Sequence, residues 1–134
     1  MYLKNYLDQH ETVKKEMDVI KRLITSSDIA VHSKEIASHI NTLAGKISMH
    51  LLMEDRYLYP GLAEHGNEQI KKMSETFQKE MGNLAEVFMS YKERYNTAPK
   101  VIQNMNSIKS DTNEVFSKIE KRIQKEETEL YKFI

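Results

Sequence analysis

The sequence predicts an all-α protein, an up-down-up-down antiparallel four-helix bundle, and three observations support this prediction. Apolar residues recur every three or four positions along four long stretches, which is the period of one helix face. Gly and Pro are scarce, with 4 and 2 among 134 residues, whereas turn-rich β folds need many of both. No stretch of useful length alternates apolar and polar residues as a half-buried strand does. Four amphipathic helices with short links are typical of an antiparallel bundle.

The expected helices have boundary signals in the sequence. They cover about residues 2–25, 29–59, 68–95 and 99–133, within a single domain over residues 1–134. Ser26, Ser27 and Asp28 offer N-caps for the second helix, because their side-chain oxygens can accept from the first free N–H groups. Pro60 and Gly61 predict its end, since proline lacks the N–H that would continue a helix.

The fourth helix carries two further signals. Pro99 suits its first turn, where no backbone N–H is needed. The polar run 109–113 (Lys-Ser-Asp-Thr-Asn) interrupts the apolar pattern, so we expect a bend there.

Composition excludes several classes of function. Lys plus Arg and Asp plus Glu are both 20, so the chain lacks the net charge that would recruit nucleic acid or an anionic membrane. The absence of Cys excludes disulfides and thiolate metal sites. No apolar run predicts a transmembrane span or a signal peptide, so we expect a cytoplasmic protein. No P-loop, Ser-His-Asp or GxGxxG pattern indicates an enzyme of those classes, and an enzyme is the less favoured interpretation.

Four polar residues stand where the helical pattern expects apolar ones. They are His10, His50, Glu54 and Glu126. His50 and Glu54 are four residues apart and therefore share a helix face. A carboxylate left ionised in a bundle core costs several kcal/mol, on the order of 3–5, unless it has a partner. A divalent metal with imidazole and carboxylate ligands would supply that partner. The alternative is that these histidines are half-exposed and the glutamates reach solvent.

A weak internal repeat relates the two halves of the chain. At an offset of 72 residues Glu54 coincides with Glu126, and His50 coincides with Arg122. The same offset aligns Asp55 with Glu127 and the pair Leu58-Tyr59 with Leu130-Tyr131. A histidine of the first half is therefore an arginine in the second.

The sequence resembles the hemerythrin-like (HHE cation-binding) family. The resemblance lies in YLDQHETV around His10, in HLLMEDRYLYP, and in KEETELY near the C-terminus. It implies a four-helix bundle with a di-iron centre. One iron of that centre takes a histidine from each of the first two helices, and the other takes two from the third helix and one from the fourth. Carboxylates from the second and fourth helices bridge the irons. His10, His50, Glu54 and Glu126 match these positions.

Three ligand positions of the family differ in this chain. Phe77 and Met81 stand at the third-helix histidine positions, and Arg122 stands at the fourth-helix position. All three losses fall on the same iron. Arg122 lies four residues before Glu126, so its guanidinium could bond Glu126 and also Glu54. We expect it to replace the charge of the missing metal. What remains is a site for at most one Fe, Zn or Mn ion, or for none.

The resemblance implies a cation-binding protein in oxygen, nitric oxide or iron sensing, or in iron handling. Reversible O2 transport needs two irons, so the incomplete site argues against it. Two alternatives stay open, namely a metal-free helical interaction module and a mononuclear-iron enzyme acting on peroxide or nitric oxide. A small diatomic ligand, a protein partner and a homo-oligomer are all compatible with the sequence.

Other polar residues admit a structural explanation. His32 and His39 share a helix face, and a second metal site there is the alternative to two histidines at the edge of the core. Tyr57, Tyr59 and Tyr131 near the helix ends are expected to pack with solvated hydroxyl groups.

Overall fold

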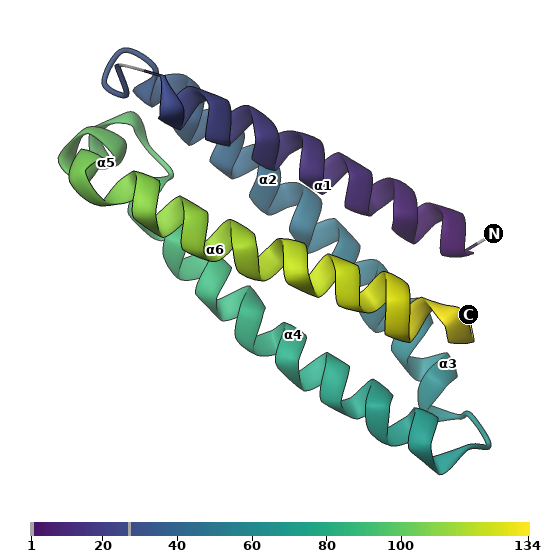
Figure 1. Cartoon of the computed structure of the whole chain (residues 1–134). Coiled ribbons are helices and arrows are strands. Elements are labelled where there is room, and N and C mark those ends of the chain that lie inside the picture. Colours follow the sequence, from purple (N-terminus) through teal and green to yellow (C-terminus); the bar gives the residue numbers. More distant parts are fainter. Residues whose placement is uncertain (1, 27) are drawn as a thin grey trace.

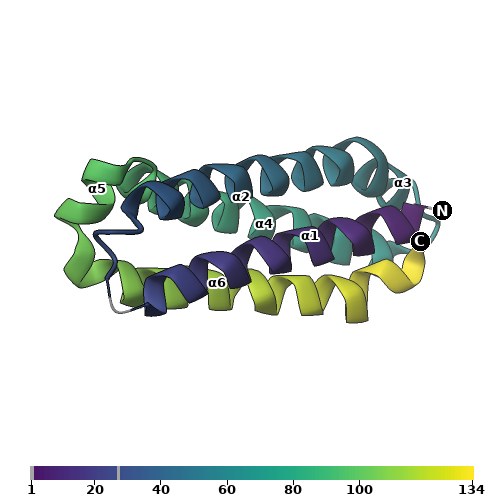
Figure 2. The same ribbon diagram turned by 90° about the horizontal axis from the view of Figure 1, so that it is seen from above.

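Four long helices run along one axis in alternating directions in the computed structural model, which describes residues 2–26 and 28–134 (Figure 1). They are α1 (Tyr2–Thr25), α2 (Ser33–Met53), α4 (Glu68–Tyr95) and α6 (Met105–Lys125). α1 packs against α2 and α6, and α4 packs against the same two helices, so the four close into a bundle (Figure 2). The prediction of an all-α four-helix bundle is confirmed. The start of α1 and the C-terminus lie at the same end of the bundle as α3 (Tyr59–Ala63).

The start of α2 differs from the prediction. α2 begins at Ser33 after His32, which makes no side-chain cap, rather than at residue 29. Asp28 caps a turn instead, because its Oδ1 accepts from the backbone N–H of Val31 at 3.2 Å. The expected cap at Ser27 lies outside the described residues. α4 has the predicted bounds, and Asn67 caps it.

The second helix continues past Pro60. A π-helical segment, η1 (Glu54–Leu58), follows α2, and α3 then runs to Ala63. The prediction that Pro60 ends the helix is therefore wrong. Pro60 occupies the first turn of α3, where its missing N–H costs nothing.

The fourth expected helix is interrupted earlier than predicted. α5 (Ala98–Gln103), with Pro99 in its first turn, ends at Asn104, and α6 starts immediately after it. Residues 109–113 lie within α6 without a break, so the predicted bend there is wrong. Thr112 is buried in the core and hydrogen-bonds the Tyr91 hydroxyl at 2.8 Å, which satisfies a polar group that a bend would have exposed.

The C-terminal end repeats the π-helical pattern of the second helix. After α6, η2 (Glu126–Leu130) is π-helical and η3 (Tyr131–Phe133) is a 3-10 turn. Glu54 and Glu126 each open a π-helical segment, at positions that the internal sequence repeat pairs. Such segments are frequent at functional sites.

A layer of polar side chains divides the core into two clusters. The larger cluster includes Val13, Ile47, Phe88 and Ile123. The smaller cluster, nearer the chain ends, consists of Tyr6, Leu58, Tyr59, Leu62, Phe77, Leu130 and Tyr131. The polar layer lies between these two apolar clusters. It consists of His10 on α1, His50 on α2, Glu54 at the start of η1, Arg122 on α6 and Glu126 at the start of η2. Within the described part of the chain, no helix combines the length and apolarity needed to cross a membrane.

Candidate metal centre

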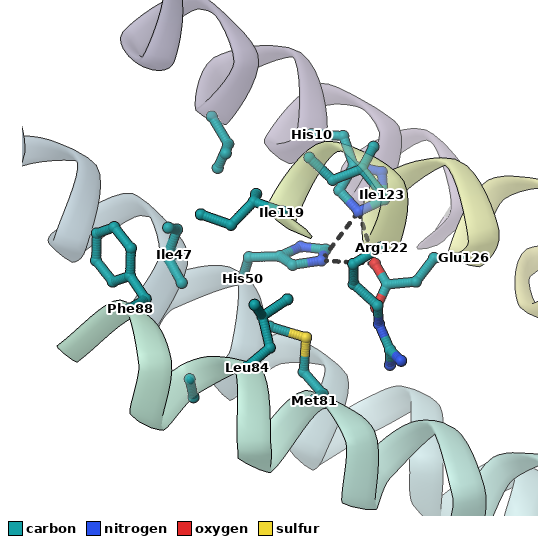
Figure 3. A pocket seen from close by; sticks show the side chains of 12 residues that line it. His10, Ile47, His50, Met81, Leu84, Phe88, Ile119, Arg122, Ile123 and Glu126 are labelled. Carbon is teal, nitrogen blue, oxygen red and sulfur yellow. Dashed lines mark hydrogen bonds and ion pairs between the residues drawn. The ribbon is translucent and has the colours of Figure 1, made fainter. Parts of the chain in front are cut away.

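Three of the predicted ligands meet at one buried point. His10 on α1, His50 near the end of α2 and Glu126 at the start of η2 expose 1%, 7% and 1% of their surfaces. His10 Nε2 lies 3.1 Å from His50 Nε2 and 2.9 Å from Glu126 Oε1, and the distance from His50 Nε2 to Glu126 Oε1 is 3.4 Å. Figure 3 shows the two rings and the carboxylate turned toward one another.

Hydrogen bonds behind the two imidazoles assign their tautomers. His10 Nδ1 donates to the carboxylate of Glu127 at 2.7 Å, and His50 Nδ1 donates to the side-chain oxygen of Gln9 at 2.7 Å. Each Nδ1 therefore carries a proton. In a neutral imidazole Nε2 then turns its lone pair toward Glu126, whereas in a protonated one Nε2 donates to Glu126 Oε1. Histidines that bind metals are oriented by acceptors of this kind on the opposite nitrogen. In the neutral form of both rings these lone pairs converge, and a cation between them would stabilise the arrangement.

The spacing of the three donor atoms fits one metal ion. Ligands bonded at about 2.1 Å lie roughly 3.0–3.4 Å apart when their bonds meet at right or tetrahedral angles. The observed separations of 2.9, 3.1 and 3.4 Å span this range. Among the described residues these three form the group of histidine and carboxylate side chains able to hold an ion. Two imidazoles and a carboxylate suit Fe(II), Zn or Mn, and the arrangement does not identify which.

Glu54 lies beside this group without belonging to it. Its side chain is fully buried. Its Oε2 accepts from the Tyr131 hydroxyl at 2.8 Å, and its Oε1, which has no hydrogen-bond partner, lies 3.4 Å from His50 Nε2. Burial and the neighbouring charge of Glu126 raise the pKa of Glu54 to about 9. Without a cation this carboxyl group is therefore neutral at pH 7.

Glu126 and Arg122 form a buried ion pair. Burial acts to raise the pKa of Glu126, but hydrogen bonds with His10 and His50 and the charge of Arg122 outweigh it and hold that pKa well below its usual range. Arg122 Nε donates to Glu126 Oε2 at 3.1 Å. The carboxylate thus offers one oxygen to the histidines and the other to the guanidinium. The predicted second bond, from Arg122 to Glu54, is not formed.

Phe77 and Met81, which the resemblance places at histidine positions of the family, have different surroundings. The backbone carbonyl of Phe77 accepts from Arg122 Nη2 at 2.8 Å, and its ring lies 4.6 Å below the guanidinium carbon. Tyr59 accepts from the same Nη2 at 3.1 Å. The Phe77 carbonyl and ring, the Tyr59 hydroxyl and the Glu126 carboxylate together hold the Arg122 side chain. Met81 lies farther along α4, where it lines a cavity.

That cavity lies directly beside the donor atoms. The volume open to the centres of water-sized molecules is about 30 Å³. One or two such molecules fit in it. Its lining residues include His10, His50, Arg122 and Glu126, and the remainder are Val13, Ile47, Met81, Leu84, Ala85, Phe88, Ile119 and Ile123. The surface that these residues expose to the cavity is apolar, so a small molecule there would contact mainly carbon atoms beside the donor group.

Sequence reasoning missed three residues of the site. Gln9 and Glu127 orient the histidines, and nothing in the sequence singled out Gln9. Tyr131 was expected to have a solvated hydroxyl, and so was Tyr59. Both expectations are wrong, because the two side chains are buried and their hydroxyl groups bond site residues. The internal repeat, which pairs Tyr59 with Tyr131, was the available signal.

The other histidines lie away from this centre. His39 Nδ1 pairs with the carboxylate of Glu16 at 2.5 Å, and Lys46 pairs with the other oxygen of Glu16 at 2.9 Å. His32 Nδ1 lies 3.6 Å from Glu35 on the next turn. In the part of the chain that the structure describes, neither His32 nor His39 belongs to a group of three side chains able to hold an ion.

The fold and the site together define a helical-bundle protein with a buried histidine-carboxylate centre. The family model described as "Hemerythrin HHE cation binding domain" matches residues 2–134. The chain belongs to this family. No curated protein and no solved structure matches it.

Proposed function

We propose that this protein binds a single metal ion through His10, His50 and Glu126, and uses it to sense oxygen, nitric oxide or iron, or to handle iron. The convergence of two Nε2 atoms on one carboxylate oxygen is the observation that carries the proposal. A bound metal would act there as a Lewis acid able to take a further small ligand.

Charge balance supports one ion rather than two. The charged groups around the histidines are the carboxylates of Glu54, Glu126 and Glu127 and the guanidinium of Arg122, when Glu54 is ionised. Glu127 bonds His10, Arg122 bonds Glu126, and Glu54 bonds Tyr131. Their net charge of about −2 matches one divalent ion, and a second ion would leave an excess of positive charge in a buried layer. Arg122 also occupies the side of Glu126 that a second ion would need.

The adjacent cavity supports a small ligand. Its volume of about 30 Å³ is enough for a diatomic molecule. Because the transport of O2 by this family needs a pair of irons, a site for one ion favours sensing or iron handling.

Metal titration tests the binding proposal. Metal-free protein is titrated with Fe(II) under anaerobic conditions, or with Zn²⁺, and the stoichiometry is measured by calorimetry and elemental analysis. We expect one ion per chain for the natural protein and loss of binding in His50→Ala. His65→Ala is the matched control, since His65 is exposed in a loop and its ring accepts from the backbone N–H of Asn67. Uptake that His50→Ala leaves unchanged would contradict the proposal.

The ligand is tested separately. We expect nitric oxide to change the optical spectrum of the Fe(II)-loaded protein and to leave the metal-free protein unchanged. A loaded protein whose spectrum responds to neither nitric oxide nor O2 would argue for iron handling over gas sensing.

A further inference from the structure

Tyr131 places a phenol group inside the candidate metal centre. It belongs to the C-terminal turn η3, and its side chain is 3% exposed. Its ring lies between two others, with centroids 5.4 Å from Tyr6 and 5.3 Å from His10, and it is within 20° of parallel to the His10 ring. The ring is therefore held in position by two stacked aromatic contacts. Its hydroxyl lies among the polar atoms of the site.

The hydroxyl oxygen is nearly equidistant from the three donor atoms. It lies 3.0 Å from His10 Nε2, 3.4 Å from His50 Nε2 and 3.2 Å from Glu126 Oε1. These four atoms, the three donors and the hydroxyl oxygen, make six pairs. The distance within every pair is between 2.9 and 3.4 Å. They form a nearly regular tetrahedron. Four ligands at about 2.0 Å from a tetrahedral metal are separated by about 3.3 Å.

The protons of these groups point away from the centre of the tetrahedron. His10 gives its Nδ1 proton to Glu127, and His50 gives its own to Gln9. The shortest hydrogen bond of the Tyr131 hydroxyl, 2.8 Å, goes to Glu54. With neutral imidazoles and the Tyr131 hydroxyl donating to Glu54 rather than to Glu126, lone pairs of all four atoms face one another, and a cation between them would stabilise this arrangement.

We propose that the Tyr131 oxygen is the fourth ligand of the metal, completing a tetrahedral set with His10, His50 and Glu126. This inference rests on the proposed single-ion site and adds a ligand to it. With a metal bound, Tyr131 would hold it through a deprotonated oxygen. Glu54, which carries a proton in the metal-free protein, would release that proton to solvent, and its Oε2 would then take the hydroxyl proton of Tyr131. Glu54 is then a proton acceptor of the site rather than a direct ligand. Tyrosine oxygen is an established ligand of iron.

The internal repeat supplies a matched control. Tyr59 occupies the position equivalent to Tyr131 and is equally buried, but its hydroxyl accepts from Arg122 and bonds none of the four donor atoms. Tyr59→Phe and Tyr131→Phe each remove one buried hydroxyl from the same structural position in the two halves. A change that occurs only in Tyr131→Phe cannot be attributed to the loss of a buried tyrosine hydroxyl in general.

The test uses two metals as probes. Ferric iron bound by a tyrosine oxygen absorbs visible light through charge transfer, so we expect a visible band in the natural protein and in Tyr59→Phe, and none in Tyr131→Phe. The Zn²⁺ affinity should fall about 10- to 100-fold in Tyr131→Phe alone, as for other lost contacts of a metal site.

The outcomes separate the ligand from the site. A natural protein that binds one Zn²⁺ with an affinity that Tyr131→Phe leaves unchanged or tightens would overturn the role of Tyr131 and preserve the single-ion site. A natural protein that binds neither probe would overturn both. Circular dichroism of each variant verifies that the bundle is folded.

Discussion

Replacing Arg122 by methionine should strongly destabilise the metal-free protein. The side chain is 7% exposed, and its guanidinium is the cation bonded to the buried carboxylate of Glu126. Methionine fills much of the space of the arginine stem but removes the charge. The carboxylate of Glu126, 1% exposed, then lacks its partner, and the Tyr59 hydroxyl and the Phe77 carbonyl lose a donor.

The magnitude follows from the burial of the pair. Removing one member of a buried ion pair costs about 3–5 kcal/mol of unfolding free energy, because an unpaired charge remains in the core. For a chain of this length, a loss of about 3 kcal/mol lowers the melting temperature by about 10 °C. Lys125 provides the matched control. It lies on the same helix and approaches the same Phe77 ring and Glu80, but its side chain is 41% exposed. Lys125→Met should change the unfolding free energy by about 0.5 kcal/mol or less.

Urea unfolding in the presence of a chelator measures both variants. Adding Glu126→Gln to Arg122→Met should recover about half of the lost stability, because the orphaned charge is then removed as well. The reasoning would be refuted if Arg122→Met were as stable as Lys125→Met, since the guanidinium would then not be the counter-charge of the buried layer.

Three further predictions concern the same layer. Because the pKa of Glu54 in the folded protein, about 9, exceeds its ordinary value of 4.5, the folded state holds the extra proton. Its contribution to stability is complete below pH 4.5 and is lost as the pH rises toward 9, with a slope of up to about 1.4 kcal/mol per pH unit. In urea titrations of metal-free protein from pH 5 to 9, Glu54→Gln should flatten this decline, and an unchanged slope would argue against a neutral Glu54. Restoring histidine at Phe77, Met81 and Arg122 together should raise the metal stoichiometry from one to two per chain by elemental analysis, whereas a value that stays at one would indicate that other residues exclude the second ion. Ala85→Phe should fill the cavity and slow nitric oxide binding to the Fe(II) protein at least several-fold in stopped-flow measurements while leaving Zn²⁺ affinity unaltered, and equal rates would show that the ligand does not enter there.

The sequence predicted the bundle well because the information is local and repeated. An apolar residue at every third or fourth position determines which face of each helix is buried, and α1 and α4 begin and end where the pattern does. The errors lie where a local signal was overruled by its surroundings. A proline ends a helix where the backbone N–H at its position is needed for a hydrogen bond. Pro60 lies in the first turn of α3, where that N–H is not needed. The polar run around Thr112 suggested a bend, but Tyr91 on another helix satisfies that threonine.

The site was predictable in its ligand positions and not in its surroundings. His10, His50, Glu54 and Glu126 stood out because they interrupt the apolar pattern of the core. Gln9 did not stand out, because an exposed or half-exposed glutamine is ordinary on any helix. Its role depends on how His50 of a neighbouring helix turns its ring.

Tyr131 was overlooked for a related physical reason. Tyrosines at helix ends usually place the hydroxyl in water. In this chain the π-helical segment from Glu126 to Leu130 precedes the turn that carries Tyr131, and the hydroxyl lies among the donor atoms. The change in helix type cannot be derived from residue periodicity.

Anomalous diffraction from crystals grown with Zn²⁺ tests the central claim most directly. We predict one metal peak per chain, bounded by His10 Nε2, His50 Nε2 and Glu126, with the Arg122 guanidinium still bonded to the far oxygen of Glu126. Two peaks within the bundle, or an Arg122 side chain extended into solvent, would contradict the account.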